Sequence, residues 1–118
     1  RHIQFERYVC RMPVISLNEE NFDRVTSSPV PVLVDFYAPW CGSCRAVAPI
    51  VERLGGEKTE NFEVAKVNID EEAELAHRFG IQSVPTFAVF RDGELAERRV
   101  GALRERELLD LIYGAGSV

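Results

Sequence analysis

The chain has 118 residues, of which 46% are hydrophobic and 28% charged, and its formal net charge is −5. This length and composition are typical of one soluble globular domain, and the negative charge argues against nonspecific binding to nucleic acid. Every hydrophobic run is too short to span a membrane, and the start of the chain does not resemble a secretory signal. We therefore expect a cytoplasmic protein without nucleic-acid or membrane partners.

The first predicted elements are a short strand, a helix and a longer strand. The short strand covers residues 14–17. Ser16 and Glu19 have the spacing of a capping box, which predicts a helix that starts there and runs to about residue 27. Residues 32–37 are apolar except for one acid, so we expect this strand at the centre of a sheet that helices cover on both faces.

A Cys-x-x-Cys pair follows this strand closely. Cys41 and Cys44 are expected at the start of a helix over residues 41–54, which the glycine pair at residues 55–56 should end. The amides and the dipole of a helix start stabilise a thiolate, so Cys41 is the expected nucleophile. Cys44 comes one turn later and is the expected resolving thiol. The pair can store and release two electrons as a disulfide and a dithiol.

The rest of the chain alternates between strands and helices and closes with a hairpin and a helix. Asp92 and Gly93 form the predicted hairpin turn, because this dipeptide between two strand-like runs is a strong turn signal. The elements are strands over residues 62–69, 86–90 and 94–100 and helices over residues 71–79 and 103–113. The complete order predicts an α/β fold, in which a mixed central sheet has helices on both faces.

The third cysteine, Cys10, falls within residues 1–13, which show no clear core face and are interpreted as an N-terminal extension. An odd cysteine count argues against the disulfide framework of a secreted protein. We expect Cys10 to be an incidental thiol, and the alternative is regulation or dimerisation through it. Together with His2 and His77 it forms no second ligand pair, so the redox interpretation is preferred over half of a zinc site and no metal is expected.

Asp35 is an acid in a strand that should be buried. A buried carboxylate without a partner is costly, so the pKa of Asp35 is expected to rise towards neutral pH. Such a carboxyl can accept the proton of Cys44 as that thiol attacks. The alternative is a structural acid that forms an ion pair with Lys66. The two interpretations are compatible, because a lysine beside the acid would tune its pKa.

Five separated parts of the chain resemble the thioredoxin family in order and spacing. They are residues 34–44 (VDFYAPWCGSC), 48–49 (AP), 66–70 (KVNID), 83–87 (SVPTF), and the pair 92–93 and 100–102 (DG and VGA). The resemblance extends over roughly residues 14–113 and implies a thioredoxin fold for a domain that we take as residues 14–118. Ser43 departs from the family, which usually has proline between these cysteines.

The resemblance also implies roles for further residues. Asp35 would be the family's buried acid and Lys66 its neighbour, both acting with the catalytic cysteines. From the sequence alone Val84-Pro85 could be a turn, whereas the resemblance implies a cis-proline opposite the cysteines, whose preceding backbone groups pair with a target chain. The surface expected to bind target proteins is apolar and flat and comprises Trp40, Gly42, Ser43, Ile69, Val84, Pro85, Gly101 and Ala102.

The function that the resemblance implies is reduction of disulfides in target proteins by a monomeric enzyme that uses Cys41 and Cys44. Electrons would come from thioredoxin reductase, an NADPH-dependent flavoprotein, and the chain itself would need no cofactor. Two alternatives remain open. Ser43 is compatible with a disulfide-forming or isomerising domain, because the residues between the cysteines tune the redox potential. A binding or chaperone module on the same fold would not need the cysteines.

Overall fold

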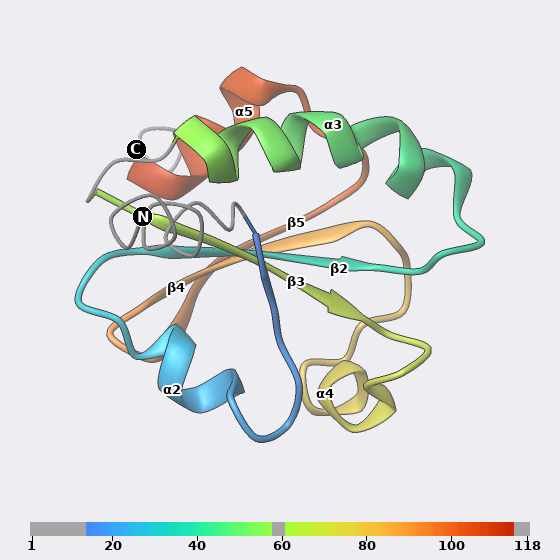
Figure 1. The fold of residues 1–118 in the computed structure, drawn as a ribbon, viewed down its shortest axis with the longest axis horizontal. Helices are drawn as coiled ribbons and strands as arrows, with labels where there is room; N and C mark the ends of the chain where they lie inside the picture. The colour runs from blue at the N-terminus through green and yellow to red at the C-terminus, as the bar shows by residue number, and fades with distance from the viewer. Residues whose placement is uncertain (1–13, 58–60, 115–118) are drawn as a thin grey trace, which may run out of the picture.

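The computed structural model describes residues 14–57 and 61–114. These residues form the predicted order of strands and helices (Figure 1). The elements are β1 (Ile15–Ser16), α2 (Phe22–Thr26), β2 (Val32–Tyr37), α3 (Gly42–Glu57), β3 (Glu63–Asn68), α4 (Ala73–Arg78), β4 (Thr86–Arg91), β5 (Glu94–Val100) and α5 (Glu105–Tyr113). The predicted extension over residues 1–13, with His2 and Cys10, lies outside the described residues.

The five strands form one mixed sheet in the order β1-β3-β2-β4-β5. β1 and β2 both pair parallel with β3, whereas β4 pairs antiparallel with β2 and with β5. α3 and α5 cover one face of the sheet, and α2 and α4 cover the other (Figure 1). Residues 32–36 of the central strand β2 are all buried, because helices cover both of its faces. The prediction for this strand was therefore correct.

Side-chain alternation along β2 divides the core between the two faces of the sheet. Leu33 packs in the hydrophobic cluster beneath α3 and α5, while Val34 and Phe36 pack in the cluster beneath α2 and α4, since successive strand side chains point to opposite faces. By the same alternation Asp35 shares the face of Leu33. It therefore lies beneath the helix that carries Cys44.

The predicted capping box was wrong. Ser16 belongs to β1, and α2 begins only at Phe22. The turn before α2 is closed by Asn18 and Asn21, because the side-chain oxygen of each accepts a hydrogen bond from the other's backbone N–H, at 2.9 and 2.8 Å. Short amide side chains favour such turns by bonding to nearby backbone groups. The turn before the helix is therefore formed by Asn18 and Asn21, and not by a capping box of Ser16 and Glu19.

Other helix boundaries also differ from the prediction. The glycine pair at residues 55–56 does not end α3, which runs to Glu57. Glycine weakens a helix interior by roughly 0.5–1 kcal/mol, but Leu54 is buried in the core and holds this part of the helix against the sheet. α4 starts two residues later than predicted, because the amides of Glu71 and Glu72 bond to the Asn68 carbonyl and close a separate turn.

Candidate active site

Cys41 and Cys44 lie where the chain passes from β2 into α3, at the carboxyl end of the central strand. The Cys44 backbone N–H donates to Cys41 Sγ at 3.1 Å, and the Ser43 hydroxyl oxygen lies 3.4 Å from the same sulfur. Both cysteines are free thiols, and their exposed fractions are similar, 6% for Cys41 and 4% for Cys44. Hydrogen bonding therefore distinguishes the two thiols more than access does.

The two thiols differ in pKa. Burial alone would raise the pKa of Cys41, but hydrogen bonds from the Cys44 side chain, the Ser43 hydroxyl and the backbone amides of both residues outweigh it and lower that pKa. Burial raises the pKa of Cys44 to about 12, and its hydrogen bond to Cys41 adds to the shift. Cys41 is thus the thiol that ionises first.

Apolar side chains surround the two sulfur atoms. Ala38 packs with both cysteines in a small buried cluster, and Tyr37, Ile69 and Val84 lie against it. A low-polarity environment strengthens the hydrogen bonds to the Cys41 sulfur. Ile69 and Val84, two residues of the expected target surface, are therefore placed beside the thiols.

A second segment, 43 residues later in the chain, also lies beside Cys41. The Val84–Pro85 peptide bond is cis, as the family resemblance implied. The Cys41 thiol can donate to the Val84 carbonyl oxygen at 3.7 Å. The Pro85 carbonyl accepts a hydrogen bond from the Gly101 N–H at 2.8 Å, and Gly101 has a φ of +114°, a conformation that favours glycine. Exposed Ala102 follows directly.

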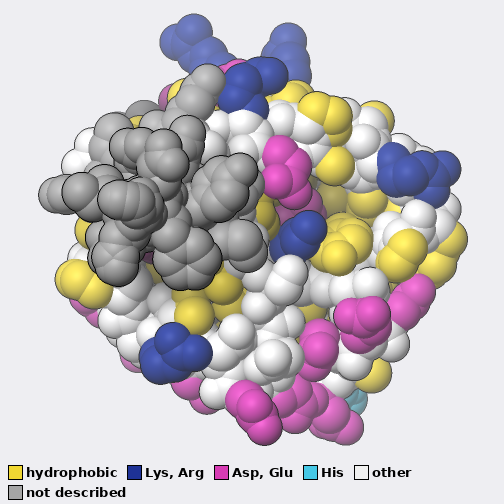
Figure 2. All heavy atoms as spheres, viewed as in Figure 1, with side chains coloured by type: hydrophobic (Ala, Val, Ile, Leu, Met, Phe, Trp, Pro, Cys, Tyr) yellow, Lys and Arg dark blue, Asp and Glu magenta, His cyan; other side chains and the backbone are white. Residues whose placement is uncertain are grey.

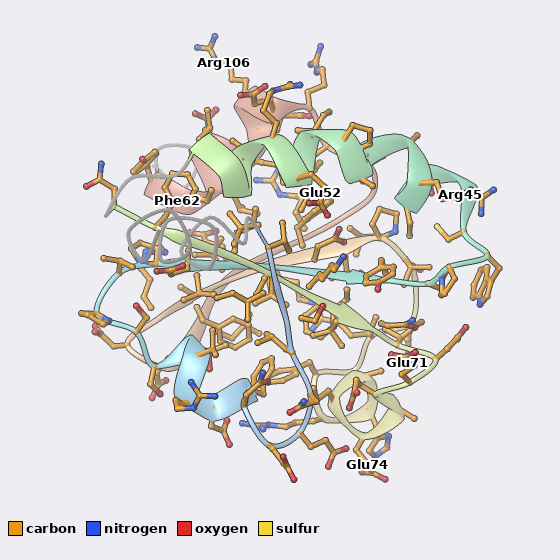
Figure 3. All side chains as sticks on the ribbon, viewed as in Figure 1. Arg45, Glu52, Phe62, Glu71, Glu74 and Arg106 are labelled. Atoms are coloured by element: carbon orange, nitrogen blue, oxygen red, sulfur yellow. The ribbon has the colours of Figure 1, made fainter. Side chains whose placement is uncertain are left out.

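Trp40 stands at the rim of the site with 66% of its surface exposed. Its indole N–H donates to the Asp70 carboxylate, at 3.1 Å from Oδ2. Acidic side chains gather over α4 next to this point (Figure 2), and Glu71 and Glu74 belong to them (Figure 3). Asp70 belongs to the family-like motif at residues 66–70, which gave no role for this side chain. Its bond to Trp40 depends on the fold and had no local signal.

A cavity of about 230 Å³ lies behind Cys44, beneath α3. Asp35, Glu52 and Lys66 supply its charged side chains together with Arg45. Asp35 is buried, and within residues 14–57 and 61–114 its Oδ1 has no hydrogen-bond partner. Burial raises the pKa of Asp35 to about 7, the charge of Lys66 opposes this rise, and the charge of Glu52 adds to it. A carboxyl with this pKa can exchange a proton near neutral pH.

The alternative interpretation of Asp35, an ion pair with Lys66, does not hold in the structure, where Lys66 pairs with another carboxylate. The two residues are neighbours in the register of β2 and β3, but the Lys66 ammonium pairs with the Glu52 carboxylate at 3.7 Å. Glu52 lies on the side of α3 that faces the sheet (Figure 3). No sequence motif points to Glu52, although its position eight residues after Cys44 and four after Ala48 places the three on neighbouring parts of one helix surface.

Among residues 14–57 and 61–114, no group of three or more His, Cys, Asp and Glu side chains is placed to hold a metal ion. No helix over residues 14–57 and 61–114 is long and apolar enough to cross a membrane.

A thiol of lowered pKa at a helix start, with a second thiol one turn later, is the arrangement of a dithiol–disulfide oxidoreductase. Comparison with known proteins identifies the family. The family model described as Thioredoxin matches residues 13–113. The chain therefore belongs to the thioredoxin family, as its sequence motifs had indicated.

Individual relatives agree with the family match. The chain is 43% identical over 88 residues to thioredoxin 1 of Synechococcus elongatus, covering 75% of this chain and 82% of that protein. It is 38% identical over 101 residues to thioredoxin of Bacillus subtilis, covering 86% and 96%. An M-type chloroplastic thioredoxin of Chlamydomonas reinhardtii is 39% identical over 105 residues, covering 88% and 75%.

A solved structure confirms the fold. The N21Q mutant thioredoxin from Halobacterium salinarum NRC-1 superimposes with a TM-score of 0.78 at 40% sequence identity, covering 85% of this chain and 88% of that chain. The predicted thioredoxin fold and the predicted activity, thioredoxin-type reduction of protein disulfides by an enzyme, are both confirmed by these similarities.

Proposed function

We propose that Cys41 is the nucleophile of this protein-disulfide reductase and that Cys44 is its resolving thiol. The observation that supports the assignment is the hydrogen bonding at Cys41 Sγ. This sulfur accepts a hydrogen bond from the Cys44 backbone N–H at 3.1 Å, and the Ser43 hydroxyl lies 3.4 Å from it. These donors stabilise a thiolate. The Cys41 thiolate attacks one sulfur of a target disulfide, forms a mixed disulfide with it, and releases the other target sulfur as a thiolate.

In the second step Asp35 acts as the general base. The proton of the Cys44 thiol passes to the Asp35 carboxylate, and the resulting thiolate attacks Cys41 Sγ. The bond between Cys41 and the target breaks, the second target sulfur leaves as a thiolate, and the Cys41–Cys44 disulfide closes. Two electrons have then passed to the target. A pKa of about 7 suits Asp35 to this exchange, and Lys66 modulates it through its charge.

We infer that a target chain lies across the thiols in an extended conformation. The Val84 carbonyl next to Cys41 supports this, because a backbone acceptor there can pair with the backbone of a bound strand. Trp40 offers a large exposed surface beside the same thiol. The remaining residues of the proposed target surface are Gly42, Ser43, Ile69, Pro85, Gly101 and Ala102.

We further infer that thioredoxin reductase, an NADPH-dependent flavoprotein, reduces the Cys41–Cys44 disulfide after each cycle. The protein would thus be a monomeric component of electron transport and redox homeostasis in the cytoplasm. The thioredoxin domain is taken as residues 14–118, which the family match over residues 13–113 supports, with residues 1–13 as an extension. Oxidation of NADPH by a purified reductase in the presence of this protein tests the partner directly.

Alkylation of the reduced protein at neutral pH tests the roles of the two thiols. Peptide mapping should find Cys41 labelled first. Cys44→Ser should accumulate a mixed disulfide with its target, whereas Cys41→Ser should fail to reduce insulin disulfides. Faster labelling of Cys44 than of Cys41 in the folded protein would overturn the assignment.

A further inference from the structure

Glu52 is a charged residue of α3 to which neither the family motifs nor the proposed mechanism gives a role. It lines the same cavity as Asp35 and Cys44, and its carboxylate lies 3.7 Å from the Lys66 ammonium. We propose that Glu52 is a positioning residue for the second step, because it holds the Lys66 ammonium away from Asp35 and so leaves that carboxyl free to accept the Cys44 proton. The proposal rests on the proposed role of Asp35 as the base.

Strand pairing by itself would bring the lysine to the acid. Asp35 and Lys66 are opposite each other in the register of β2 and β3, and both line the cavity beneath α3. Asp35 Oδ1 is nevertheless buried without a hydrogen-bond partner among the described residues. The ammonium instead contacts Glu52 and lies 5.8 Å from the centre of the Tyr37 ring. The lysine side chain is 32% exposed, so part of it reaches solvent.

The other groups around Asp35 do not replace this pair. The charged and titratable side chains that line the cavity are Cys44, Arg45 and Glu52 from α3, Lys66 from β3 and Tyr37 from β2. Arg45 is engaged elsewhere, because its guanidinium donates to the Pro39 carbonyl at 2.8 Å. Lys66 is therefore the cation that can neutralise Asp35, and Glu52 is the anion that competes for it.

Removal of the Glu52 carboxylate has a defined consequence. It frees the Lys66 ammonium to pair with Asp35 and also removes a neighbouring negative charge, and both changes favour the ionised form of Asp35. A carboxylate stabilised in this way is a weaker base, so transfer of the Cys44 proton slows at pH values where Asp35 is fully ionised. The first step depends on the Cys41 thiolate and should keep its rate.

The test compares Glu52→Gln with the matched control Glu105→Gln. Glu105 also pairs with a residue of α3, Arg53 at 2.7 Å, but it does not line the cavity. Carbon NMR of the Asp35 carboxyl should show a titration midpoint that falls by about 0.5–1 pH unit in Glu52→Gln and stays constant in Glu105→Gln. Stopped-flow kinetics should give a plot of the mixed-disulfide decay rate against pH. The acid limb of this plot should move to lower pH by the same amount in Glu52→Gln.

Lys66→Met separates the two ways in which Glu52→Gln can shift the titration of Asp35, which are relocation of the Lys66 ammonium and loss of the Glu52 charge. With no ammonium to relocate, the shift caused by Glu52→Gln should be smaller in the Lys66→Met background. A shift of undiminished size there would overturn the proposal, and so would equal midpoints in Glu52→Gln and Glu105→Gln.

Asp35→Asn distinguishes this inference from the mechanism on which it rests. If Asp35→Asn leaves mixed-disulfide decay unchanged, Asp35 is not the base and the catalytic role of Glu52 is overturned with it. If Asp35→Asn slows the decay while Glu52→Gln behaves like Glu105→Gln, only the role of Glu52 is overturned. Slow decay in Asp35→Asn together with the shifted profile of Glu52→Gln supports both.

Discussion

Replacing Asp35 with asparagine should remove a specific pH dependence from the stability of the fold. Burial raises the pKa of Asp35 from 3.8 to about 7, so the folded protein keeps a proton that the unfolded chain releases. The stabilisation from this proton is fully present below pH 3.8 and is lost as the pH rises to about 7. At ~1.4 kcal/mol per pH unit the whole loss is about 4 kcal/mol, of which about 3 kcal/mol falls between pH 5 and pH 8.

Urea unfolding of the two reduced proteins at pH 5, 6.5 and 8 measures this effect. The free energy of unfolding of Asp35→Asn, minus that of the wild type, should grow by about 3 kcal/mol over this range. The subtraction cancels the titration of every group that the two proteins share, as well as any constant cost of burying the amide. A difference that does not change with pH would refute the reasoning, because Asp35 would then ionise at the same pH in the folded and unfolded states.

Three further predictions concern the site. Ser43→Pro should make the disulfide more reducing by about 30 mV, or ~1.4 kcal/mol, because it removes a hydroxyl and an amide that stabilise the Cys41 thiolate. Equilibration with glutathione measures the redox potential of each protein. The potential of Ser43→Ala should fall between those of the wild type and Ser43→Pro, and a proline variant as oxidising as the wild type would contradict the prediction. Asp70→Asn should raise the KM for a protein disulfide about two- to five-fold through the weakened Trp40 contact, leaving reduction of a small aromatic disulfide unchanged; equal effects on both substrates would count against it. Gly101→Ala should cost about 1–3 kcal/mol in urea unfolding, since its φ is +114° with open space around it, and a neutral result would exclude backbone strain there.

Most elements and the cysteine pair could be predicted because their signals are local. The apolar run of β2 indicates a strand that is buried on both faces, and residues 32–36 are buried in the structure. The relation of Cys41 to Cys44 depends on a single helical turn and is therefore present in a few consecutive residues. The position of Asp35 beneath α3 also follows from strand alternation, once a helix is known to cover that face.

Boundaries and partners that depend on long-range contacts could not be predicted in this way. α3 continues through two glycines because Leu54 is packed against the sheet. Helix propensity alone does not include this tertiary contact. Asp35, Glu52 and Lys66 come from three elements, and their charges interact across a cavity that exists only when helix and strands are assembled. The sequence indicated that Asp35 would be buried and perturbed, but only the tertiary structure decided which carboxylate holds the lysine, because electrostatic interaction depends on distance in space and not on separation along the chain.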